Sequence, residues 1–354
     1  MLTRSLFVSI AMWGAAQAAS GSSITTVAGA VGGLGNGDIN AGCTTYGPPA
    51  STGHFFGSDA FGVPVGGISA CGYKGQVVEH SVASGNVSSS ANVSGAVLTL
   101  GASPAVYNGS GEAHASYTSV GVQAHGAITG GELATNPTDT FTSIGAAITQ
   151  DKMTISNASL DGQLGYVSYV YSIDGSLSAP GVAGAYEWGY ASANFGVDFN
   201  GIYYTRLFQG QVYRGQDGVA KNLGNDASGF ATGTGLIDGA QTFSTADVFS
   251  PTGFAFTFGD AFEYGIGLQA VSYGTADADF ASTVKLVGID VYDSQGHLLT
   301  DYSLTSESGT DYLAAAVPEP HEWILLGLGA LAVAMARKRS AAASPRPDAA
   351  VAIG

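Results

Sequence analysis

The sequence predicts a mainly β fold, an antiparallel β-sandwich with jelly-roll-like connectivity. Charged residues make up 11% of the chain, well below the roughly 25% typical of soluble domains. There are 53 glycines among 354 residues, and Ser, Thr, Val and Tyr are abundant whereas Lys, Glu and Leu are sparse. This composition favours strands and turns. Between the termini, no stretch has a helical period with caps.

Strand patterns differ between the two halves of the predicted β domain, residues 19–316. Residues 19–136 are weakly patterned, with short candidate strands such as Gln76–His80 and Ala96–Leu100. Residues 137–316 are strongly patterned. Gly165–Ile173 alternates apolar and polar residues with the period of two that one buried sheet face requires. The chain is long enough to bury the core of one large sandwich or of two smaller ones.

Two hairpins are predicted in the second half. Residues 194–199 and 202–208 flank Asn200-Gly201, the residue pair that best supplies the two positive φ angles of a type I′ turn. Residues 284–292 and 297–304 flank a second turn at 293–296. Both hairpins favour antiparallel pairing.

The N-terminus has the three parts of a secretory signal peptide in order. Arg4 supplies a positive charge, Leu6–Ala16 an apolar run, and Ala16-Gln17-Ala18 a cleavage site with small residues. We therefore expect residues 1–18 to form a signal helix that is removed on export.

The C-terminus has a second targeting pattern. Pro318-Glu319-Pro320 precedes an uncharged run, Trp323–Ala336, which a basic cluster follows. We expect a transmembrane helix at 322–336 and a disordered tail at 340–354. The uncharged run would span only ~21 Å as a helix, short of the ~30 Å hydrocarbon core. The basic cluster should stay cytoplasmic, which agrees with the topology that the signal peptide sets.

This tail resembles the PEP-CTERM sorting signal of exported proteins in Gram-negative bacteria. The motif residues here are Val317, Pro318, Glu319, Pro320, Arg337, Lys338 and Arg339. The resemblance implies recognition by exosortase, a membrane-embedded transpeptidase-like enzyme, and an association with exopolysaccharide and the cell surface. Two features depart from the family pattern: His321-Glu322 brings charge to the start of the helix, and Ser340–Gly354 extends past the basic cluster. An uncleaved anchor in the inner membrane is the alternative.

The two cysteines, Cys43 and Cys71, predict one disulfide if the protein reaches an oxidising compartment. In the chain-entropy model this loop would contribute roughly 3–4 kcal/mol to stability. Free or metal-binding thiols are the alternative.

Candidate binding residues come from two local patterns. Tyr186, Trp188 and Tyr190 would share one face of a strand about 7 Å apart, a spacing suited to stacking on successive sugars; the alternative is that they pack in the core. Asp277 and Asp279 have the spacing of two carboxylates on one strand face, although we expect their segment, 275–279, to be a loop that enters a strand. They are candidates for a structural calcium site, for a catalytic pair or for a plain solvated turn.

The formal net charge of −16 argues against binding to nucleic acid, because phosphates require a basic surface. No sequence motif indicates catalysis or a cofactor other than a possible calcium ion. The sequence therefore predicts an exported, non-enzymatic structural or adhesive protein of the cell surface or extracellular matrix, with exosortase as partner and the inner membrane as an intermediate location. A polysaccharide-binding module is the main alternative.

Overall fold

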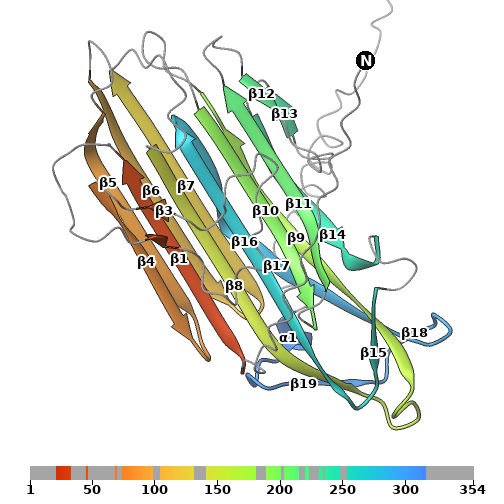
Figure 1. Cartoon of the computed structure of the whole chain (residues 1–354). Coiled ribbons are helices and arrows are strands. Elements are labelled where there is room, and N and C mark those ends of the chain that lie inside the picture. Colours follow the sequence, from red (N-terminus) through yellow and green to blue (C-terminus); the bar gives the residue numbers. More distant parts are fainter. Residues whose placement is uncertain are drawn as a thin grey trace, which may run out of the picture.

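The computed structural model shows two antiparallel sheets packed face to face (Figure 1). The predicted mainly β, antiparallel sandwich is confirmed. The structure describes residues 21–32, 45–46, 68–69, 74–98, 104–130, 141–180, 189–200, 203–214, 220–222, 231–233, 236–247 and 253–315. The predicted signal helix, the transmembrane helix with the sorting motif, and both cysteines lie outside these residues. Within the described residues, no helix is long and apolar enough to cross a membrane.

Sheet 1 contains seven strands in one path, with β19 (Ser303–Ser306) paired to β8 beside it. In spatial order the path is β12 (Ala220–Asn222), β11 (Tyr203–Arg214), β10 (Gly189–Phe199), β16 (Ala261–Gly274), β8 (Phe141–Ser156), β1 (Ser23–Gly32) and β4 (Lys74–Val82).

Sheet 2 also contains seven strands in one path, with β15 (Phe254–Thr257) paired to β9 and β18 (Leu298–Leu299) paired to β17. Its order is β13 (Ala231–Gly233), β14 (Leu236–Ser244), β9 (Leu164–Ser178), β17 (Ala276–Asp293), β7 (Ser119–Gly130), β6 (Ala105–Ser116) and β5 (Val87–Leu98). A separate short ladder joins β2 (Thr45–Tyr46) to β3 (Ile68–Ser69). The described helices are a 3₁₀ turn, Thr245–Asp247, and α1 (Tyr312–Ala315).

The weakly patterned half of the chain supplies five strands to the sandwich, β1 and β4 to β7. β6 alternates buried and more exposed residues, but its buried positions include Ala113, Ala115 and Gly111, which give little hydrophobic signal. Small residues are needed here because the sheets approach closely. A Cβ on Gly111 would lie 2.1 Å from the carbonyl oxygen of Ile144, and one on Gly145 would lie 2.2 Å from that of Glu112.

The first predicted hairpin is present, with a longer turn than expected. β10 and β11 pair from Phe199 opposite Tyr203, so three residues connect the strands, where the sequence predicted two. Asn200 has a φ of 56°, as its place in a tight turn requires. The register then shifts between Phe195 and Gly196. The bulge compensates for the extra turn residue by restoring the inward direction of Phe208, which is fully buried.

The second predicted hairpin is shorter than expected. β18 pairs with the end of β17 at Val291 and Tyr292, and the turn uses Gly296 at a φ of 82°. Beyond it, Ser303–Ser306 leaves sheet 2 and pairs with β8 of sheet 1. The second strand of the hairpin therefore ends at Leu299, and residues 300–304 do not continue it. Figure 1 shows β15, β18, β19 and α1 together at one end of the sandwich.

Candidate functional site

The predicted sugar-stacking platform is not supported at the one member that the structure describes. Tyr190 lies in β10 directly opposite Tyr213 and Tyr273 on the flanking strands. Its side chain is 5% exposed, and its ring centroid lies 5.6 Å from that of Tyr273. A ring packed in this way offers no open face to a sugar. Tyr186 and Trp188 lie outside the described residues.

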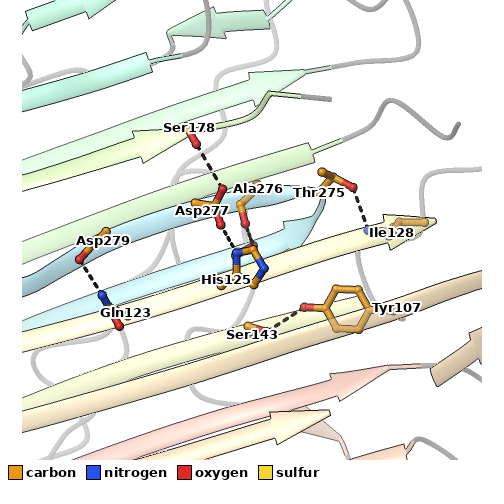
Figure 2. Close-up of polar contacts among 11 residues, drawn as sticks. Tyr107, Gln123, His125, Ile128, Ser143, Ser178, Thr275, Ala276, Asp277 and Asp279 are labelled. Carbon is orange, nitrogen blue, oxygen red and sulfur yellow. Dashed lines mark hydrogen bonds and ion pairs between the residues drawn. The ribbon is translucent and has the colours of Figure 1, made fainter. Parts of the chain in front are cut away.

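The candidate carboxylate pair, Asp277 and Asp279, lies on one face of β17 and not in the expected loop, and each carboxylate has a partner on β7 (Figure 2). Asp277 is bonded to His125 Nδ1 and accepts a 3.4 Å hydrogen bond from Ser178 Oγ. Asp279 accepts a 2.9 Å bond from Gln123 Nε2. The bond to Asp277 raises the pKa of His125 above its ordinary value, against the opposing effect of partial burial.

The arrangement of Asp277, Asp279 and their hydrogen-bond partners limits the chemistry that these side chains can perform. Ser178 donates to the carboxylate and not to His125, so the imidazole is not placed to activate the hydroxyl as in a catalytic triad. Nowhere in the described ranges do three or more His, Cys, Asp or Glu residues gather in a way that could hold a metal ion. The contact between His125 and Asp277 lies at the surface, since their side chains are 55% and 39% exposed.

A different carboxylate, Asp151 in β8, is the most heavily bonded side chain at the end of the sandwich that carries α1. It is 4% exposed. Its Oδ1 accepts from Ser22 Oγ at 2.6 Å, Lys152 N at 2.8 Å and Ser308 N at 3.1 Å. Its Oδ2 accepts from Ser308 Oγ at 2.5 Å and Tyr312 OH at 2.9 Å. We call Asp151, Ser22, Ser308 and Tyr312 the clasp, because they join the first and last described segments.

The clasp is anchored in the core through Tyr312. This side chain is fully buried in α1 and meets the ring of Tyr264 edge-on at 5.9 Å. Asp311 Oδ1 accepts the backbone N–H of Ala314 at 3.0 Å and so caps the short helix. Burial, more than the neighbouring Tyr264 and Asp151, raises the pKa of Tyr312 far above its ordinary value. The phenol is therefore a permanent donor to the carboxylate.

A row of amide side chains crosses sheet 1. Three amide residues lie side by side in register on the neighbouring strands β11, β10 and β16: Gln209, Asn194 and Gln269. Gln209 is 0% exposed and Gln269 1%. Both amide atoms of these glutamines, and Asn194 Oδ1, are buried without a hydrogen-bond partner among the described residues. We call these three residues the amide row. Each such atom carries a cost of about 1–3 kcal/mol relative to a satisfied one.

One pocket of about 290 Å³ opens at the end of the sandwich where β15 and the β10–β11 turn meet. Phe256 and Phe262 lie in it with Thr257 and Ala255, and Leu164, Asn200, Asp260 and Ala261 complete the lining. No sequence pattern indicated this pocket, because its lining comes from four segments.

Comparisons with known proteins identify no relative: no family model, curated protein or solved structure matches the chain.

Proposed function

We propose that this protein is an exported structural or adhesive component of the cell surface or extracellular matrix, delivered by its PEP-CTERM-like tail as an exosortase substrate. A jelly-roll-like sandwich, a cleaved signal helix at 1–18 and a transmembrane helix at 322–336 are part of this proposal. The β domain is proposed to have no catalytic activity of its own.

The clasp is the observation that supports this function best. Ser22 lies just after the predicted signal peptide, and Tyr312 lies just before the predicted sorting motif. Both donate to the same carboxylate of Asp151. The domain therefore begins and ends at one end of the sandwich. That arrangement suits a domain held at a membrane by a single tail, with the rest of the sandwich extending away from it.

Two cysteines in a chain that is proposed to reach an oxidising compartment favour one disulfide. We propose that Cys43 and Cys71 form this bond after export, and alkylation with and without reduction tests it.

The test of sorting is mass analysis of the full-length gene product expressed in a Gram-negative host with an active exosortase. We expect a mature N-terminus near Ala19 and a mature C-terminus near Pro318–Pro320. A variant with Pro318, Glu319 and Pro320 replaced by Ala is the matched control and should keep its C-terminus. An intact Gly354 in the inner-membrane fraction of the unaltered protein would contradict the proposal and favour a permanent anchor.

Polysaccharide binding is the second candidate function. The pocket at the end of the sandwich favours it, because Asn200, Thr257 and Asp260 bring polar side chains to the pocket beside the 47% exposed Leu164. Since Tyr190 is buried, such binding would not use the predicted three-ring platform.

A further inference from the structure

We infer that the end of the sandwich that carries α1 contacts a lipid surface through a patch on the outer face of sheet 2. The patch consists of Leu164, Tyr166, Tyr292 and Leu298, and we call it the Leu/Tyr patch. The inference rests on the proposed function, because the proposed transmembrane helix at 322–336 is what brings the domain to a membrane. It adds a contact that the proposed function does not require, namely that the folded domain itself touches lipid.

Strand pairing places the patch residues side by side. Leu298 of β18 lies opposite Tyr292 of β17, which in turn lies opposite Tyr166 of β9. Directly opposite residues of antiparallel strands share a face, with Cβ atoms about 5 Å apart. Leu164 is two residues before Tyr166 on β9 and therefore shares this face. Val167, the next residue of β9 after Tyr166, is fully buried and points into the core, so the patch points away from it.

The patch is open to solvent. Leu164 and Leu298 are 47% and 57% exposed, and both are among the few exposed large apolar side chains of the described residues. The side chains of Tyr166 and Tyr292 are half-buried. Tyrosine combines an apolar ring with a polar hydroxyl, and it is enriched where lipid headgroups meet the acyl chains. Two leucines beside two tyrosines therefore suit the surface of a bilayer.

The proposed tail keeps this end of the sandwich close to the membrane. α1 ends at Ala315, and the chain from there to residue 322 spans at most about 25 Å when fully extended. A strand of the length of β9 is roughly 50 Å long. The sandwich therefore cannot stand on its far end, because α1 would then lie beyond the reach of the tail. Figure 1 shows β18, which carries Leu298, at the same end as α1.

The charges around the patch select the kind of lipid. Asp290 lies on the same face of β17 as Tyr292, and Asp260 lines the pocket beside Leu164. His297 is paired with a carboxylate of its own turn, so it brings no net positive charge to the patch. The whole protein carries a net charge of −16. Anionic headgroups would be repelled, so the partner is a zwitterionic lipid surface.

The test is methyl NMR of the full-length protein in phosphatidylcholine nanodiscs, produced in a host without exosortase so that the tail stays attached. Lipids with a nitroxide on the headgroup should broaden the methyl signals of Leu164 and Leu298. Leu236 is the internal control, since it is 38% exposed and pairs with Ser178 on the same sheet, about 45 Å along β9 from Leu164. Its signal should stay sharp. Added phosphatidylglycerol should reduce the broadening of the two patch signals.

A matched pair of variants checks that the patch itself makes the contact. Leu298→Gln should lower the fraction of protein with its patch on the lipid about fivefold, and the Leu164 signal should sharpen accordingly. Leu236→Gln, the same change at the far end of sheet 2, should leave the Leu164 signal broadened. Both leucines are exposed, and melting curves check that both variants fold.

Co-elution of the protein with the nanodiscs reports on the tail separately. If the protein co-elutes but Leu164 and Leu298 stay sharp, or if Leu236 broadens equally, the lipid contact is overturned while the proposed tail stands. A second copy seated on the patch would overturn it too, and would appear as two proteins per nanodisc with sharp patch signals. Stronger broadening with phosphatidylglycerol would overturn the zwitterionic partner. A protein that does not co-elute overturns the inference together with the proposed transmembrane helix.

Discussion

Two regions of this sandwich bury polar side chains under opposite conditions. In the clasp, the 4% exposed Asp151 receives five hydrogen bonds from Ser22, Lys152, Ser308 and Tyr312. In the amide row, Gln209 and Gln269 are even more deeply buried, yet their amides have no partner among the described residues. The two regions bury their polar side chains to a similar extent, but their expected contributions to the free energy of unfolding have opposite signs.

The difference shows that burial alone does not measure what a polar residue contributes. An anionic acceptor with several donors gains charge-assisted bonds that are each worth about 1.5–3 kcal/mol. A buried amide without partners loses its hydration and gains nothing in return. We therefore expect the clasp to hold the fold together and the amide row to weaken it.

The largest effect is expected for Asp151→Asn. The substitution removes the charge and turns an amide N–H₂ toward donors, so several bonds are lost together. We expect the free energy of unfolding to fall by about 3–4 kcal/mol, measured by urea denaturation. Asp277→Asn is the matched control, since its carboxylate is 39% exposed and has only two bonds. If both variants lose the same free energy of unfolding, the buried carboxylate contributes no more to stability than the surface carboxylate, and the prediction is wrong.

Tyr312→Phe isolates one bond of the clasp and should cost about 2 kcal/mol, because the ring keeps its place against Tyr264 while the donor to Asp151 is lost. Tyr302→Phe removes a phenol that donates to the Ile289 carbonyl at 3.2 Å from a partly buried position. Its cost should be about 0.5–1 kcal/mol. Thermal melting of both variants checks this order, and a larger loss for Tyr302→Phe would contradict it.

Gln269→Met should raise stability by about 1–2 kcal/mol, because it replaces an unpaired buried amide with an apolar side chain of similar shape. The control is Gln123→Met, whose amide donates to Asp279 and lies on a more exposed face; it should give no gain. If Gln269→Met instead lowers stability, then the three amides of the row bond to one another in solution and the contrast with the clasp disappears.

The smallest effect concerns pH. The pKa of His125 is raised in the folded state by its bond to Asp277. A raised folded-state pKa adds stability below the unfolded value of about 6.5, and this is lost as the pH rises through the folded value. Because the imidazole is 55% exposed, solvent screens the pair and the change should be small. An NMR titration should show the His125 pKa moving back toward 6.5 in Asp277→Asn; an unchanged pKa would show that the bond is absent in solution.

Local patterns in the sequence predicted the strongly β half of the sandwich well, since Asn200-Gly201 and the alternation of Gly165–Ile173 depend on near neighbours. The spacing of Asp277 and Asp279 was compatible with a shared strand face, but the local sequence indicated a loop, and it did not indicate that β7 supplies their partners. Asp151 could not be predicted, because the residues that bond it include Ser22 and Tyr312, which are 129 and 161 positions away. The buried face of β6 was hard to detect because, apart from Tyr107, it consists of Ala and Gly.

The clasp also depends on parts of the chain that are far apart in the sequence. Ser308 and Tyr312 are among the last residues of the domain, and the carboxylate that they satisfy is in β8, near the middle of the chain. For a chain exported from its N-terminus, as proposed, β8 emerges early and remains without these donors until the final residues have crossed the membrane. Long-range contacts of this kind form slowly. In the proposed export, completion of the sandwich would coincide with the arrival of the sorting tail, and a chain truncated before Ser308 would leave Asp151 without three of its five donors.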